Sequence, residues 1–269
     1  LRLGAPDYIT KPFQLDEVRA RIGQALDKRR LVIENRRYQE HLSELVRQQA
    51  ARIEELFLQG VQTLVEALEA KDAYTRGHST RVSAYAGSTA RALGLSDTEV
   101  TLIELGAQLH DVGKIGVREA VLLKRGSLTS EEYGHLMEHT IIGERILEPL
   151  LSHVPEVLAI VRSHHERIDG SGLPDGLAGD DIPVPARVVA VCDALDAMTS
   201  DRPYRDALPS RDALDELERL RGVQFDADVV EAFCRAYTDV DRLPIPTPPK
   251  TLLRVPRPAA GAGVPASPS

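Results

Sequence analysis

Cysteine is scarce in this chain of 269 residues, which has only Cys192 and Cys234. Two cysteines so far apart exclude both a disulfide scaffold and a CxxC zinc site. The sequence also lacks a signal peptide and any apolar run of about 18 residues, so neither export nor a membrane span is expected. A reducing cytoplasm is therefore the predicted location.

Basic residues are in the minority, because 33 Lys and Arg face 41 Asp and Glu, for a net charge of −8. An acidic protein does not attract polyanions through its overall field, so DNA binding is disfavoured and a phosphate substrate would need a local group of cations. The composition, 42% hydrophobic and 28% charged, is typical of a soluble globular chain. Its length allows one full domain with appendages, or two small domains.

Residues 1–26 contain the turn-rich segment GAPDYIT and the pair Lys11-Pro12, followed by apolar residues at helical spacing. This string resembles the last loop and last helix of a two-component receiver domain, an α/β fold. The resemblance implies that Lys11 matches the lysine that contacts the phosphoryl group, and that a sensor kinase is a partner. A simple turn before a helix is the alternative. Because the chain begins with Leu1, we expect it to start inside a longer protein, with the phosphoacceptor aspartate upstream.

Three further regions follow. Residues 27–60 are highly charged, lack proline and have a narrow apolar stripe, which predicts a long helix that pairs with a second copy; a spacer packed on the neighbouring domain is the alternative. Residues 61–240 have helical periodicity almost throughout, interrupted by a Gly- and Pro-rich loop at 169–185. Residues 241–269 contain eight of the seventeen prolines and are predicted to be a disordered tail. The predicted fold is mainly α.

Two groups of polar residues follow apolar helical segments. His110-Asp111 comes after TLIELGAQL, and His164-His165-Glu166 comes after VLAIVRS. Adjacent residues on a helix point about 100° apart, so we expect each doublet to reach two neighbouring ions rather than to chelate one. A carboxylate in the apolar segment VVAVCDALDAM also needs a cation, which adds Asp193. These residues predict a multinuclear metal centre.

The chemistry of such a centre follows from its donors. Imidazoles and carboxylates without thiolates fit iron, manganese, nickel, cobalt or catalytic zinc better than structural zinc, and the sequence does not choose among them. Two divalent ions about 3.5–4 Å apart would bridge a water, lower its pKa and hold an anionic oxygen during attack at phosphorus. The predicted reaction is phosphoester hydrolysis.

Several strings between residues 61 and 240 resemble the HD-GYP branch of the HD phosphohydrolases: TRGHSTRV, HDVGK, HTIIG, HHERIDGSGLPDGL and ARVVAVCDALDAMTSDRPYR. The resemblance implies an all-helical phosphodiesterase, the output domain of a response regulator, that converts cyclic di-GMP to pGpG and sometimes to GMP. It implies two divalent ions, preferably iron or manganese. The metal ligands that it implies are His78, His110, Asp111, His139, His164, His165 and Asp193.

The same resemblance assigns the substrate contacts. Lys114, close to the catalytic Asp111, would orient the scissile phosphate or assist proton transfer, and Arg202 and Arg205 would hold the phosphates. Asp72 and Asp196 could orient ligand imidazoles from behind.

Two positions depart from the family pattern. Leu173 replaces the tyrosine of the family's Gly-Tyr-Pro loop, and because leucine neither stacks on a base nor donates a hydrogen bond, the preferred dinucleotide stays open. Tyr74 stands where some members have a glutamate ligand, which favours two ions over three.

Other functions compete with the phosphodiesterase. The string from His135 to His139 matches the H-x-x-E-H motif of inverted zinc peptidases, but that interpretation leaves the other metal-binding strings unused. A receptor that binds metal and a cyclic dinucleotide without turnover is the main alternative. A hydrolase of another cyclic dinucleotide is the third hypothesis.

Overall fold

The computed structural model describes residues 12, 14–71, 77–124, 126–201 and 206–237. The chain divides into two compact units, Leu1–Phe57 and Leu58–Ser269. Within the described residues the regular structure is helical and no β-strand occurs, apart from one isolated bridge between Arg221 and Phe225. The prediction of a mainly helical fold is confirmed. None of the described helices has the length and apolarity that crossing a membrane requires.

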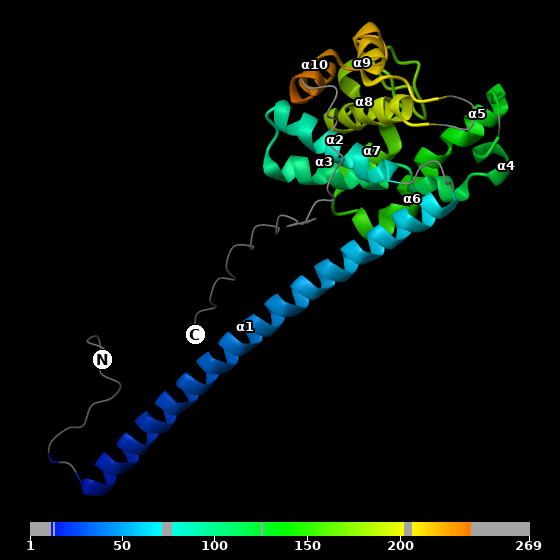
Figure 1. Ribbon diagram of the computed structural model, residues 1–269. Coiled ribbons are helices and arrows are strands. Elements are labelled where there is room, and N and C mark those ends of the chain that lie inside the picture. Colours follow the sequence, from blue (N-terminus) through cyan, green and yellow to red (C-terminus); the bar gives the residue numbers. More distant parts are fainter. Residues whose placement is uncertain (1–11, 13, 72–76, 125, 202–205, 238–269) are drawn as a thin grey trace. The chain divides into compact units, whose positions relative to one another are not determined.

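The described part of the first unit is dominated by helix α1 (Leu15–Lys71), which continues into the second unit (Figure 1). One helix therefore includes residues 15–26 of the predicted receiver segment and the whole predicted linker, where the sequence suggested two elements. The reason is local: no proline interrupts it, and Gly23 is tolerated. Ion pairs one turn apart, such as Arg36–Glu40, line its exposed surface. Apolar side chains such as Leu31 and Leu42 are also exposed.

The described part of the second unit is a bundle of short helices (Figure 1). Its elements after α1 are α2 (His78–Ala92), α3 (Asp97–Leu109), η1 (Val112–Gly116), α4 (Glu119–Leu122), α5 (Ser130–Met137), α6 (His139–Leu151), α7 (Pro155–Ser163), η2 (Gly179–Asp181), α8 (Val184–Thr199), α9 (Ser210–Arg219) and α10 (Ala227–Ala236).

Local side-chain chemistry fixes several helix starts. Ser96 precedes α3 and accepts a hydrogen bond from the backbone N–H of Glu99, whose carboxylate accepts the Ser96 N–H in return. Thr129 and Glu132 form the same capping box at α5. A proline in the first turn of α7 and another in that of α8 supply backbone already suited to a helix start. The residue immediately before each of these helices has a non-helical backbone conformation.

The main hydrophobic core lies among α2, α3, α7, α8, α9 and α10. Val82, Ile103, Ile160, Val188 and Phe233 are completely buried there. The core holds α2, α3, α7 and α8 against one another, and each of these helices supplies or precedes a predicted ligand.

Candidate metal centre

Four predicted ligands meet near the ends of α2 and α3 and on α8. His78 begins α2, His110 and Asp111 follow the last turn of α3, and Asp193 lies within α8. The Nε2 atom of His78 is 3.4 Å from Nε2 of His110 and 3.3 Å from Oδ1 of Asp193. Oδ2 of Asp111 is 3.5 Å from Nε2 of His110. We call these four residues the His78 cluster.

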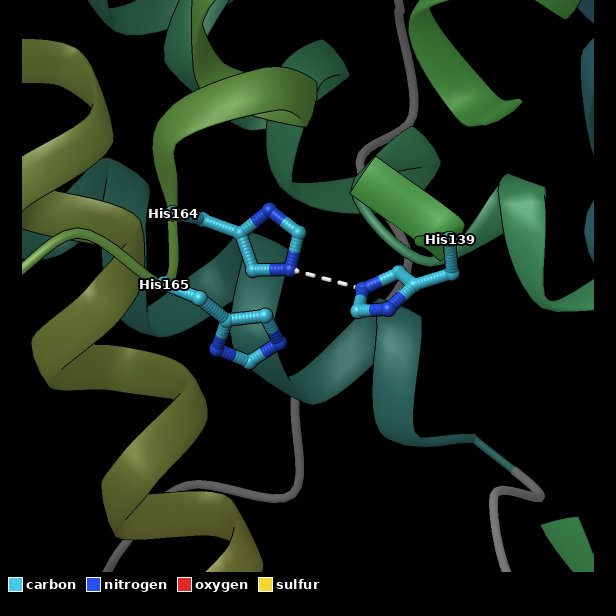
Figure 2. Close-up of side chains that lie close together, drawn as sticks. All are labelled: His139, His164 and His165. Atoms are coloured by element: carbon cyan, nitrogen blue, oxygen red, sulfur yellow. Dashed lines mark hydrogen bonds between the residues drawn. The ribbon is translucent and has the colours of Figure 1, made fainter. Parts of the chain in front are cut away.

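The other three predicted ligands form a second group, the His139 cluster, made of His139, His164 and His165 (Figure 2). His139 begins α6, whereas His164 and His165 follow the end of α7. Nε2 of His139 is 3.2 Å from Nε2 of His164, and one donor atom from each ring lies within 4.8 Å of the others. The three rings converge from two helix ends on a common volume.

Asp111 faces both clusters. Its Oδ2 atom belongs to the His78 cluster, while its Oδ1 atom is 3.5 Å from Nε2 of His139. The ammonium group of Lys114 lies 2.5 Å from the same Oδ2 atom. One carboxylate therefore lies between the two groups of predicted ligands, with a cation beside it.

The far sides of the imidazoles are also occupied. In three of the rings, the Nδ1 atom is within hydrogen-bond distance of a backbone carbonyl. In the fourth, His78, the Nδ1 atom is 2.7 Å from Oδ2 of Asp196. A carbonyl oxygen only accepts, so Nδ1 must donate and Nε2 keeps its lone pair for a metal. The carbonyl contacts are His110 to Ala107 (2.7 Å), His139 to Leu136 (2.8 Å) and His164 to Val161 (2.9 Å).

Burial and neighbouring charges set the protonation of the donors. Burial lowers the pKa of His139 to about 3, and burial lowers the pKa of His164 and of His165 as well. Burial opposes the charged form of His78 too, but its hydrogen bonds to Asp193 and Asp196 outweigh that effect and raise its pKa to about 9.

The two carboxylates of the His78 cluster stay ionised. Burial raises the pKa of each, but nearby cations and hydrogen bonds outweigh it: Lys114 and the imidazoles hold the pKa of Asp111 well below its usual range, and His78 and His110 do the same for Asp193. Nitrogen and carboxylate donors without thiolate fit divalent iron, manganese, cobalt, nickel or catalytic zinc. The residues therefore fit divalent metal ions, and burying so many titratable side chains is costly unless cations join them.

A close approach of two backbones brings Asp111 to His139. η1 packs on α6 at Gly113, where an added Cβ atom would lie 1.9 Å from the carbonyl oxygen of His139 and 2.5 Å from the backbone nitrogen of Gly143. Only glycine permits this contact, which explains the glycine in HDVGK.

Glu166 joins neither cluster. Its buried carboxylate accepts the backbone N–H groups of Asp175 at 2.7 Å and Leu177 at 3.1 Å, while the backbone N–H of Leu173 donates to the carbonyl of His165. The Gly- and Pro-rich loop with Leu173 is thus tied directly to the residues that follow α7.

The grouping of one doublet differs from the expectation. His164 and His165 lie in the same cluster, whereas the helical spacing predicted that they would point to two ions. The reason is that α7 ends at Ser163, so the doublet does not follow the helical period. His135 does not join His139 as an inverted zinc peptidase would require, because its ring contacts Glu138 and the backbone of Arg118 instead.

The remaining predicted residues have different outcomes. Asp196 is placed behind His78 as expected. Lys11, Asp72, Tyr74, Arg202, Arg205 and the predicted tail after residue 240 lie outside the described residues. Sequence reasoning missed Arg81, which contacts Asp196 through Nε at 2.6 Å and Nη2 at 2.9 Å. Its position one helical turn after His78 was the available signal.

Comparison with known proteins gives one family and several relatives. The HD domain family matches residues 62–229. A cyclic di-GMP phosphodiesterase of Thermotoga maritima is 38% identical over 245 residues, covering 88% of this chain and 67% of that protein. The cyclic di-GMP phosphodiesterase response regulator RpfG of Xanthomonas campestris pv. campestris is 37% identical over 255 residues, covering 90% and 65%. The chain thus spans about two thirds of the length of these two relatives.

Relatives with another substrate in their names also match. The 3′3′-cGAMP-specific phosphodiesterase 3 of Vibrio cholerae is 37% identical over 169 residues, covering 63% of this chain and 36% of that protein. Among solved structures, a cyclic GMP-AMP specific phosphodiesterase of Vibrio cholerae superimposes with a TM-score of 0.54 at 18% identity, covering 66% of this chain and 48% of that one. This structural likeness shows the fold alone.

Proposed function

The chain is a member of the HD domain family, and on that premise we propose that it is a metal-dependent phosphodiesterase that hydrolyses cyclic di-GMP to pGpG and sometimes onward to GMP. The observation that carries the proposal is the convergence of the His78 and His139 clusters on the two oxygens of Asp111. The names of the relatives from Thermotoga maritima and Xanthomonas campestris support the substrate.

In this proposal the seven predicted ligands hold two divalent ions, preferably iron or manganese, with nickel, cobalt or zinc as alternatives. The ions supply Lewis acidity and an activated water when bound. Asp111 would contribute to both metal positions, since each of its oxygens faces one cluster.

Lys114 is proposed to contact the phosphate. Its side chain is partly exposed and its ammonium group is next to Asp111, where it would offset negative charge that develops on the phosphate. Arg202 and Arg205 are proposed to bind the other phosphate oxygens, because an acidic chain needs local cations for a dianionic substrate.

The residue at position 173 and the name of one relative favour a second substrate, 3′3′-cGAMP. Leu173 occupies the loop position where the family tyrosine would be, and a relative named for 3′3′-cGAMP matches 63% of this chain. The loop is held close to the His139 cluster by the hydrogen bond from Leu173 to His165. Side-by-side turnover of the two dinucleotides by the parent chain and by Leu173→Tyr measures what this position contributes.

The proposed setting is a cytoplasmic response regulator. The resemblance of residues 1–26 to a receiver domain and the match of 90% of this chain to a relative named as a response regulator support it. A sensor kinase would act on the receiver, and the exposed apolar residues of α1 between 27 and 60 would pair with a second copy. Sedimentation of the whole chain at several concentrations tests the homodimer.

The activity is tested with protein purified without oxygen, with its metal content counted. The parent and a His110→Ala/Asp111→Ala variant are incubated with cyclic di-GMP while pGpG and GMP are separated by chromatography. Product only from the metal-loaded parent supports the hydrolase. Two bound ions and intact dinucleotide binding without product would favour the silent receptor. Absence of both binding and product would redirect the assay to 3′3′-cGAMP.

A further inference from the structure

A partly buried ion pair lies directly behind one predicted ligand of the metal centre. The side chain of Asp196 is only 2% exposed, and its Oδ2 atom is 2.7 Å from Nδ1 of His78. Arg81 contacts both oxygens of the same carboxylate, with Nε 2.6 Å from Oδ1 and Nη2 2.9 Å from Oδ2. Nη2 of Arg81 also donates to the hydroxyl of Ser200 at 3.2 Å.

This support is confined to one cluster. The three imidazoles of His110, His139 and His164 donate to backbone carbonyls, which are fixed by the helices themselves. His78 instead depends on a side-chain carboxylate, which could rotate unless something holds it. The orientation of His78 is therefore the one among these four that a side-chain substitution can loosen.

The planar fork of Arg81 is suited to that task. An arginine that contacts both oxygens of a carboxylate fixes the plane of the carboxylate as well as its position. Once that plane is fixed, the hydrogen bond to Nδ1 fixes the ring of His78 and the direction in which its Nε2 atom points.

The ligand contact and the supporting ion pair join the same two helices, one helical turn apart. Arg81 lies one turn after His78 on α2, and Asp196 lies one turn after Asp193 on α8. His78 is 3.3 Å from Asp193, and Arg81 pairs with Asp196, so two neighbouring contacts join the same pair of helices. One of these contacts belongs to the metal-binding residues, and the other lies behind them.

We propose that Arg81 is a positioning residue of the metal centre that, through Asp196, sets the affinity of the His78 cluster for a divalent ion without affecting the His139 cluster. This inference rests on the proposed two-ion centre. Loss of such an outer partner costs about 10- to 100-fold in metal affinity. Arg81 is proposed to act through Asp196 and not as a substrate contact.

The test uses Mn²⁺ as the probe and the whole chain as the sample. Metal-free protein is titrated with Mn²⁺ by calorimetry, and bound ions are counted after equilibrium dialysis. The binding step that weakens in Asp193→Asn is assigned to the His78 cluster, and the step that weakens in His165→Ala is assigned to the His139 cluster. In Arg81→Gln we expect the first of these steps to weaken by about 10- to 100-fold and the second to stay within about twofold of the parent.

Two further variants separate positioning from folding. Arg81→Lys keeps the charge without the planar fork, so its affinity at the His78 cluster should lie between those of the parent and Arg81→Gln. Arg187→Gln is the matched control, because Arg187 lies on α8 and pairs with Asp226 and Asp180, none of which is a predicted ligand. It should lower the melting temperature while leaving both Mn²⁺ steps unchanged.

The outcomes are distinguishable. If the parent and Arg81→Gln bind two Mn²⁺ ions equally well, the role of Arg81 is refuted while the metal centre stands. Equal weakening of both steps, or of the step that His165→Ala identifies, also refutes it, because the effect would not act through His78. A parent that binds no Mn²⁺, Fe²⁺ or Zn²⁺ would refute the metal centre and this inference together.

Discussion

Gly113→Ala is the substitution that most directly tests how the two clusters are brought together. The added Cβ atom would lie 1.9 Å from the carbonyl oxygen of His139, roughly 1.5 Å inside ordinary van der Waals contact. Both obstacles, this oxygen and the backbone nitrogen of Gly143 at 2.5 Å, are main-chain atoms that cannot rotate away. η1 and α6 must therefore separate.

The size of the effect follows from that separation. Overpacking of a tight contact costs about 1–3 kcal/mol, which corresponds to a melting temperature lower by roughly 2–10 °C in a chain of this size. Oδ1 of Asp111 and Nε2 of His139 are 3.5 Å apart, so a shift of about 1 Å would disturb the shared carboxylate and cost about 100-fold in turnover. We also expect fewer than two ions per chain.

Differential scanning calorimetry, metal analysis and the cyclic di-GMP assay are run on Gly113→Ala beside Gly134→Ala. Gly134 lies in α5 with no heavy atom within 4 Å of an added Cβ, so the same substitution should stabilise the protein by about 0.4–1 kcal/mol. Parental melting temperature and metal content in Gly113→Ala would refute the argument that close backbone contact joins the clusters.

Three other predictions concern the surroundings of the site. Glu166→Ala leaves two loop N–H groups without their acceptor, at about 1–3 kcal/mol each, and limited proteolysis should cut the loop after residue 169 faster than in the parent. Burial raises the pKa of Asp226, but Arg187 and two backbone N–H groups outweigh it and lower the pKa. Its ionised form therefore stabilises the fold above about pH 4 and less as the pH falls, so the melting temperature of Asp226→Asn should fall less steeply on acidification. Removing the metal with a chelator should lower the melting temperature of the parent, since an ion at 100 times its dissociation constant contributes about 2.7 kcal/mol, and a chelator without effect would contradict a bound metal.

Periodicity predicted the helices better than it predicted the positions of the ligands. The apolar pattern before His110 and before His164 corresponds to α3 and α7. Each helix ends at the residue before its ligand doublet, and periodicity does not report that end. The direction of the doublets was therefore out of reach, whereas the residue types alone were enough to suggest a metal centre.

Contacts between residues far apart in the sequence were also not predicted. Arg81 and Asp196 are 115 residues apart in the sequence, so no local pattern pairs them, although each lies one turn after a predicted ligand. Gly113 is similar: the sequence contains the glycine, but its contact with α6 depends on how η1 packs. Local signals such as Ser96 and Glu99 at the start of α3 follow a known capping pattern and could have been predicted.

The ends of the helices explain why so many ligands lie there. The last four carbonyls of a helix have no N–H partner within it. Ala107 in α3, Leu136 in α5 and Val161 in α7 all belong to such last turns, and each accepts from an imidazole three residues further along the chain. One hydrogen bond thus satisfies a helix end and also fixes the tautomer that leaves Nε2 open to a metal. A histidine three residues after a last-turn carbonyl serves the fold and the site together, whereas Nδ1 of His78, at the start of α2, contacts Asp196, which Arg81 holds.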